Sequence, residues 1–454
     1  MRRRVSLTVA MALWAFTAAA QPPQEAAQLA REGRTLAPAE VQVLENALKT
    51  TPDDLSARTR LVGYYFSSGL AALGADATRA ARRRHILWII EHHPEAEVTM
   101  LSEMTIDPAG HPLADADAYA EGKKLWLAQV AAHKDDPRML IHAARFFRLP
   151  ERVLALDLLK QAIRLSPGDV AAAELGYTYA ITILGITMIN NNGLPMNADP
   201  VAATAPLARQ SVEELRSSTN LTMVRVAAGI LSQYGVMVSL ASRGAINEDA
   251  LAEELLKKVE AEDTTDFLTP QSLASFYHLR WVRGATQEEK AGFARQELQH
   301  AELALSRSGG NEDWHRSLLI TAAKAAIEAN EVATARQRAA QALADVGSRN
   351  DRTTGQIIHD SHIVLGRVAL RSGQVDEAKA HLIQAGKVTG GGTLTSFGPN
   401  MSLAKELFER GERDAVLQYL EECNMFWSFN GTARRWIDTI KAGGTPNFAP
   451  NLID

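Results

Sequence analysis

The sequence predicts an all-α fold in which pairs of short helices repeat along the chain. After residue 25, apolar residues recur at spacings of three and four, and the helix formers Ala, Leu, Glu, Arg and Gln dominate. Short breaks of Gly, Asn, Asp or Pro separate the predicted helices. We find no convincing alternation of apolar and polar residues, which a half-buried strand would show.

The first 20 residues have the three parts of a secretory signal. The basic residues Arg2 to Arg4 precede an apolar run, 5–16, and small residues end the segment at Ala20. This run is shorter than the roughly 20 residues that a membrane-spanning helix needs. We therefore expect cleavage near Ala20, a soluble periplasmic or extracellular protein, and no transmembrane segment in the mature chain. A retained membrane anchor is the alternative.

The composition limits the class of partner. The chain has 48 basic and 53 acidic residues, and the predicted signal removes three basic ones, which leaves 45 against 53 and a net charge of −8. Because phosphate binding requires a basic surface, this balance argues against a nucleic-acid partner. The single cysteine, Cys423, cannot form an internal disulfide. We expect it to be a buried thiol, with a reactive or ligating thiol as the alternative.

We divide the remainder into five parts. The loop around 190–195 has the sequence Asn-Asn-Asn-Gly-Leu-Pro, which cannot continue a helix, and it is our candidate subdomain boundary. A last helix containing Trp436 is expected to cap the array. The parts are degenerate helical repeats at 21–189, an irregular loop at 190–200, helical repeats at 201–350, two clear repeats with the capping helix at 351–442, and an extended tail at 443–454.

The clearest repeat covers residues 359–387. A large residue and a tiny one, Leu365 and Gly366, begin a close contact between two helices, and Gly373 makes the turn between them. A second unit follows at an offset of 38 residues, from Leu365 to Leu403. Gly411 is the predicted turn of the second unit. The other predicted packing residues are Ala369, Ala378, Leu382 and Ala385 in the first unit and Ala404, Leu407, Val416, Leu420 and Cys423 in the second.

These matches resemble the tetratricopeptide repeat family, and the segments 359–385, 396–400 and 426–427 look like the end of uncharacterised secreted bacterial tetratricopeptide proteins. The resemblance implies that the first helix of each pair lines a ligand groove. It therefore implies an exported scaffold or adaptor that binds a protein or peptide partner in the cell envelope. Arg367 and Lys405 are candidates to clamp a carboxylate, although an ordinary solvated surface is the alternative. The groove-facing positions are Tyr177, Asp360, Ile363, Arg367, Leu370, Met401, Lys405 and Phe408.

His359 and His362 carry the rival hypothesis. Their spacing of three places both on one face of a predicted helix, as in some metal sites. The alternative function is thus a metal-dependent or enzymatic helical array with a pocket that uses this pair. Packing also explains His362, which occupies a large-residue position of the repeat. Because no nucleophile turn, phosphate loop or zinc-protease motif occurs, we expect no cofactor, no metal and no enzymatic activity.

Overall fold

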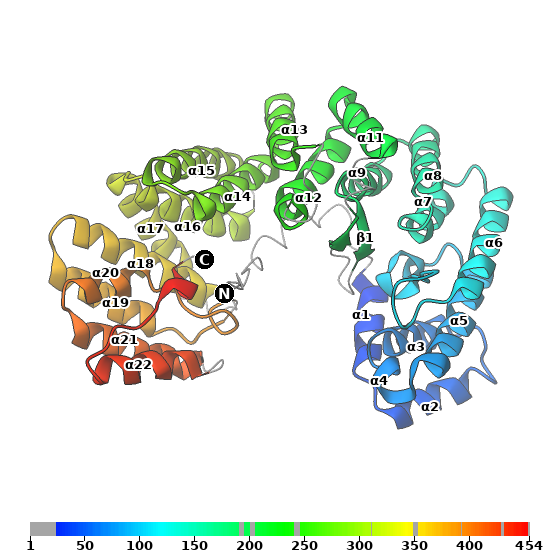
Figure 1. Cartoon of the computed structure of the whole chain (residues 1–454), viewed down its shortest axis with the longest axis horizontal. Coiled ribbons are helices and arrows are strands. Elements are labelled where there is room, and N and C mark those ends of the chain that lie inside the picture. Colours follow the sequence, from blue (N-terminus) through cyan, green and yellow to red (C-terminus); the bar gives the residue numbers. More distant parts are fainter. Residues whose placement is uncertain are drawn as a thin grey trace. The chain divides into compact units, whose positions relative to one another are not determined.

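The computed structural model describes residues 24–189, 195–199, 205–239, 246–309, 311–347, 353–391, 393–427 and 431–452. These residues divide into two compact units, with the division after Glu262 (Figure 1). Both units are built from antiparallel helix pairs, which confirms the predicted all-α, tetratricopeptide-like solenoid. No helix among the described residues combines the length and the apolar character that a membrane crossing needs. The predicted signal, 1–20, lies outside the described residues.

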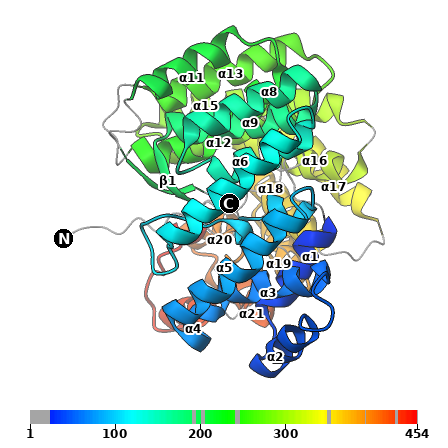
Figure 2. The same ribbon diagram turned by 90° about the vertical axis from the view of Figure 1, so that its right-hand side faces the viewer.

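The N-terminal unit packs its helices closely at glycines. A Cβ atom on Gly63 of α3 would lie 2.1 Å from the backbone oxygen of Ala30 in α1, and one on Gly176 of α9 would lie 2.2 Å from that of Met223 in α12. Within this unit α3 also lies beside α5 (Figure 2). Its helices are α1 (Gln24–Arg34), α2 (Pro38–Ala47), α3 (Leu55–Ser67), α4 (Gly69–Leu73), α5 (Ala75–His92), α6 (Ala116–Ala132), α7 (Pro137–Phe147), α8 (Arg152–Leu165), α9 (Asp169–Ile183), α11 (Pro206–Ser217), α12 (Leu221–Ser239) and α13 (Glu248–Glu262), with 3-10 turns at Glu97–Met100 and Ser102–Met104.

A small hairpin corrects the expectation that the chain has no strands. Strand β1 (Ile186–Ile189) pairs antiparallel with β2 (Pro195–Ala198). The two strands flank the Asn-rich segment, of which residues 190–194 lie outside the described part. The predicted boundary at 190–200 is therefore inside the N-terminal unit, where α9 packs against both α11 and α12. The periodicity analysis missed these strands because each is only four residues long.

The C-terminal unit contains four successive helix pairs and a last helix. The turns within three of the pairs place one residue in the left-handed region: Asn330 (φ 65°), Gly373 (φ 77°) and Gly411 (φ 91°). This conformation favours Gly and Asn, so the turns match the repeat pattern. The elements are α14 (Leu268–Arg283), α15 (Gln287–Arg307), α16 (Glu312–Glu328), α17 (Val332–Val346), α18 (Thr354–Arg371), α19 (Val375–Gly386), α20 (Ser402–Glu409), α21 (Arg413–Phe426), α22 (Thr432–Lys441) and a 3-10 turn at Ala449–Asn451.

An apolar core joins the last two repeats to the capping helix α22. The packing residues predicted from Ala369 to Cys423 are buried in it, together with Trp427 and Trp436. Residues 443–452, predicted as an extended tail, pack on this core, and Phe448 lies edge-on to Trp436 with 5.1 Å between ring centroids. Asn451 then donates from Nδ2 to the carbonyl of Phe397 at 3.0 Å. The chain end thus covers the outer apolar face that a terminal repeat would otherwise expose.

Candidate functional site

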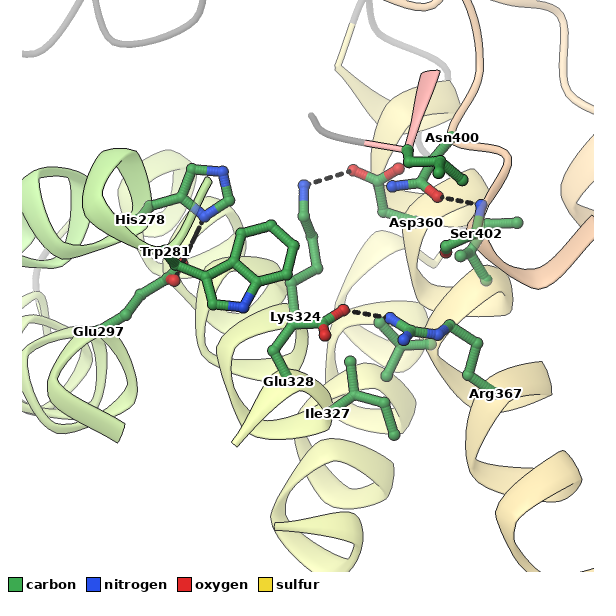
Figure 3. A pocket seen from close by; sticks show the side chains of 13 residues that line it. His278, Trp281, Glu297, Lys324, Ile327, Glu328, Asp360, Arg367, Asn400 and Ser402 are labelled. Atoms are coloured by element: carbon green, nitrogen blue, oxygen red, sulfur yellow. Dashed lines mark hydrogen bonds and ion pairs between the residues drawn. The ribbon is translucent and has the colours of Figure 1, made fainter. Parts of the chain in front are cut away.

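Several helices of the C-terminal unit enclose a narrow slot, which we call the inner slot (Figure 3). Its cavity volume is about 30 Å³, which is room for roughly two water molecules or the end of one side chain. Helices α14, α15, α16 and α18 line it, and the start of α20 and the chain end close it. The lining residues are His278, Trp281, Glu297, Lys324, Ile327, Glu328, Asp360, Ile363, Val364, Arg367, Asn400, Ser402 and Leu452.

Arg367 connects three successive repeats. Its guanidinium hydrogen-bonds to Glu328 of α16 and, from Nε at 2.7 Å, to Oε1 of Glu406 of α20. Burial alone would lower the pKa of Arg367, but the two carboxylates hold this pKa above its ordinary value. The three residues form what we call the Arg367 ladder, with 39 residues between successive members.

Asp360 is the second anchored charge of the inner slot. It is buried and accepts hydrogen bonds from His359 Nδ1 and from Gln356 Nε2, both at 2.9 Å, and Lys324 Nζ lies 3.7 Å from Oδ2. Burial acts to raise the pKa of Asp360, but Lys324, and then His359 and Gln356, lower this pKa below its ordinary value. This carboxylate is therefore held as an anion at neutral pH.

A histidine and a carboxylate form the opposite wall. His278 of α14 lies 3.1 Å from Oε1 of Glu297 in α15, whose side chain is buried. Trp281, one helical turn after His278, stacks on its ring with 5.6 Å between centroids. The wall thus combines an aromatic face with a buried acidic group, as Figure 3 shows.

The structure separates the groove residues that the repeat register predicts. Asp360, Ile363 and Arg367 line the inner slot, whereas Leu370 and Met401 are packed in the apolar core. The register argument placed these two at the surface, but both belong to the cluster that also contains Trp436 of α22 and Phe448 of the last segment. Phe408 is also part of this core, and its ring lies edge-on to Phe448, with 6.3 Å between the centroids.

Two further predicted residues lie away from the inner slot. Lys405 lies on α20 with its side chain 43% exposed, and it pairs with Glu409 at 2.6 Å. Tyr177 belongs to the N-terminal unit, where the guanidinium of Arg148 lies 4.5 Å from its ring centroid. Arg367 and Lys405 each contact a glutamate, and the clamp of these two cations for a carboxylate stays a prediction.

Sequence reasoning missed most of the polar lining, including Lys324 and Glu328, and it missed Glu406, which contacts Arg367. A signal was present, because opposite charges recur one repeat apart at Glu328, Arg367 and Glu406. The other wall, with His278 and Trp281, comes from a repeat whose sequence pattern is degenerate, and it has no comparable signal.

The histidines of the metal hypothesis have separate partners. His359 is fully buried, and its Nε2 lies 3.0 Å from the Tyr419 hydroxyl. His362 instead faces His381, with 2.9 Å between the two Nδ1 atoms, and burial followed by the charge of His381 lowers the pKa of His362 to about 4. Within the described ranges, no three His, Cys, Asp or Glu side chains come together as a metal-binding group.

Cys423 is buried, as predicted, and burial raises the pKa of its thiol. The thiol form is therefore the one present at neutral pH, and it packs among apolar side chains of the last repeats.

Comparison with known proteins finds similarity among solved structures only. No family model matches the sequence, and no curated protein matches it. The human IFIT1 dimer with m7Gppp-AAAA is 17% identical over 88% of this chain and 84% of that one, with a TM-score of 0.37. The human IFIT1 dimer with PPP-AAAA is 15% identical over 90% and 96%, with a TM-score of 0.34. Yeast Tom70 is 11% identical over 89% and 85%, with a TM-score of 0.30.

Proposed function

We propose that this chain is an exported tetratricopeptide-type scaffold, and not an enzyme, and that it binds a protein or peptide partner at the inner slot. The supporting observation is that charged side chains from α15, α16 and α18 line this slot together. Together with Glu406, which contacts Arg367, the inner slot has four carboxylates and two cations. They belong to Glu297, Glu328, Asp360, Glu406, Lys324 and Arg367.

This balance favours a basic segment of the partner over an acidic one. The two cations already contact carboxylates, so an incoming carboxylate would meet mainly acidic groups. A lysine ammonium is compact and fits a cavity of about 30 Å³, and it adds the positive charge that the inner slot lacks. The same acidic excess agrees with a partner that is not a nucleic acid.

A random peptide library tests the proposal. We expect peptides selected on the immobilised wild-type protein to be enriched in Lys and Arg. The enrichment should fall by at least half on a Glu328→Gln/Glu406→Gln protein, and it should persist on the Glu409→Gln control, which alters an exposed carboxylate of α20. Selected peptides that are acidic, or that bind the double variant equally well, would contradict the proposal.

The export part of the proposal depends on the signal-like segment at residues 1–20. We expect the protein recovered from the periplasmic or extracellular fraction of its expressing cell to begin at Gln21. N-terminal sequencing measures this directly. A protein that retains Met1 and sediments with membranes would instead support an uncleaved anchor.

A further inference from the structure

The N-terminal unit contains a second cavity, of about 400 Å³, which we call the Arg152 pocket. This volume is within the range of small-molecule binding sites. The loop at 107–111, the α7–α8 connection, the end of α9, strand β1 and the start of α11 contribute to it. Its lining residues are Asp107, Pro108, Ala109, Gly110, His111, Leu149, Pro150, Arg152, Thr182, Thr187, Met188, Ile189, Ala205 and Leu207.

The Arg152 pocket has the composition of a site for an amphipathic molecule. Several of its wall residues are apolar and only partly buried, so they expose hydrocarbon surface to the cavity. They are Leu149, Pro150, Met188, Ile189 and Leu207. Thr182 and Thr187 also line the pocket, and the Thr182 hydroxyl donates to the backbone carbonyl of Thr178 at 2.6 Å.

Arg152 is the one cation among the residues that line this pocket. It is the first residue of α8, and its Nη1 donates to the carbonyl of Ile181 at 3.3 Å. The adjacent acid, Glu151, is occupied elsewhere, since it accepts from Tyr119 at 2.8 Å and from Lys123 at 2.7 Å. In the described part of the chain no carboxylate forms an ion pair with Arg152. The segments 190–194 and 200–204, which lie outside that part, contain no Asp or Glu.

The surroundings of Arg152 favour a bound anion. Burial lowers the pKa of Arg152 to about 10, and the charge of Asp199 opposes this only in part. No side chain caps the N-terminus of α8, where Arg152 stands, and the positive end of the helix dipole repels a cation there. A negative ligand group would relieve both effects.

The neighbouring acid restricts the charge of the ligand. Asp107 lines the same pocket and contacts His111, with 2.8 Å between Oδ2 and Nε2. The backbone N–H of Leu113 donates to His111 Nδ1 at 3.2 Å, so Nδ1 is the acceptor and Nε2 is the nitrogen that donates to Asp107. The carboxylate of Asp107 on this wall disfavours ligands with two or more negative charges, such as phosphate esters.

We propose that the Arg152 pocket binds a small monocarboxylate with a hydrocarbon chain. The carboxylate sits on the guanidinium of Arg152, whose planar fork matches two carboxylate oxygens, and the chain lies against the apolar wall. This site is in the N-terminal unit and is independent of the inner slot.

Calorimetric titration of the full chain with sodium octanoate tests the proposal, with octanamide and sodium acetate as matched probes. We expect saturable binding of octanoate, and affinities at least about tenfold weaker for octanamide, which lacks the charge, and for acetate, which lacks the chain. Arg152→Gln should weaken octanoate binding by at least about tenfold. Arg164→Gln, at the exposed end of the same helix, should leave octanoate binding unchanged.

A second variant keeps the test valid if Arg152→Gln does not fold. Leu207→Glu places a negative charge on the partly exposed wall, and it should weaken octanoate binding more than octanamide binding. Equal affinities for octanoate and octanamide, octanoate binding that survives both pocket variants, or no octanoate binding at millimolar concentration would each overturn the proposal.

Discussion

Removal of the Arg367 guanidinium should destabilise the C-terminal unit through the charges that it leaves behind. The side chain of Arg367 is only 11% exposed and contacts two glutamates. In Arg367→Met those carboxylates lose their counter-charge. Loss of one partner of a fully buried ion pair costs about 3–5 kcal/mol. Glu328 is 26% exposed and Glu406 is 32% exposed, so water solvates both in part. We therefore expect Arg367→Met to lower the free energy of unfolding by about 2 kcal/mol.

Urea unfolding, followed by the tryptophan fluorescence of the full chain, measures this cost. The matched control is Arg371→Met, which removes an exposed arginine from the end of the same helix and should cost less than about 0.5 kcal/mol. The triple variant Arg367→Met/Glu328→Gln/Glu406→Gln should recover at least half of the loss, because no uncompensated charge remains. The reasoning is refuted if Arg367→Met costs no more than the control, or if the triple variant is no more stable than Arg367→Met.

Three further predictions concern packing, pH and metal. Gly176→Ala should lower the free energy of unfolding by about 2 kcal/mol, because its Cβ would meet the backbone oxygen of Met223 at 2.2 Å. Gly292→Ala in α15, which has open space around it, should raise that free energy by up to about 1 kcal/mol. Urea unfolding measures both, and equal effects would exclude the close contact as the cause. The pKa of His362 in the folded state is about 4, below the ordinary 6.5, so the unfolded state binds the proton more readily. The melting temperature should therefore fall as the pH drops from 6.5 to 4, and His362→Gln should reduce this fall. An unchanged dependence of the melting temperature on pH in this variant would contradict the assignment. Elemental analysis of the purified protein should find no stoichiometric metal, whereas one equivalent that His362→Ala removes would favour the metal-dependent alternative.

The local sequence determined the helix pairs and their internal packing. Leu365, Gly366 and Gly373 specify a close helix contact and a left-handed turn within one repeat, and these effects act over a few residues. Cys423 could be placed in the core for the same reason, since its position in the repeat is a packing position. Such features are periodic, so the sequence pattern is sufficient to predict them.

Only the tertiary structure decided which helix faces stay uncovered. Leu370 and Met401 are buried in a cluster that includes Trp436 and Phe448, far along the chain. Asn451 reaches residues 52 and 54 positions earlier in the chain. Arg152 likewise reaches the carbonyl of Ile181, 29 residues away, and its pocket combines several segments of the N-terminal unit. The repeat pattern predicts contacts within a helix pair. A slot or pocket instead depends on where elements far apart in the sequence meet, and local periodicity does not predict those contacts.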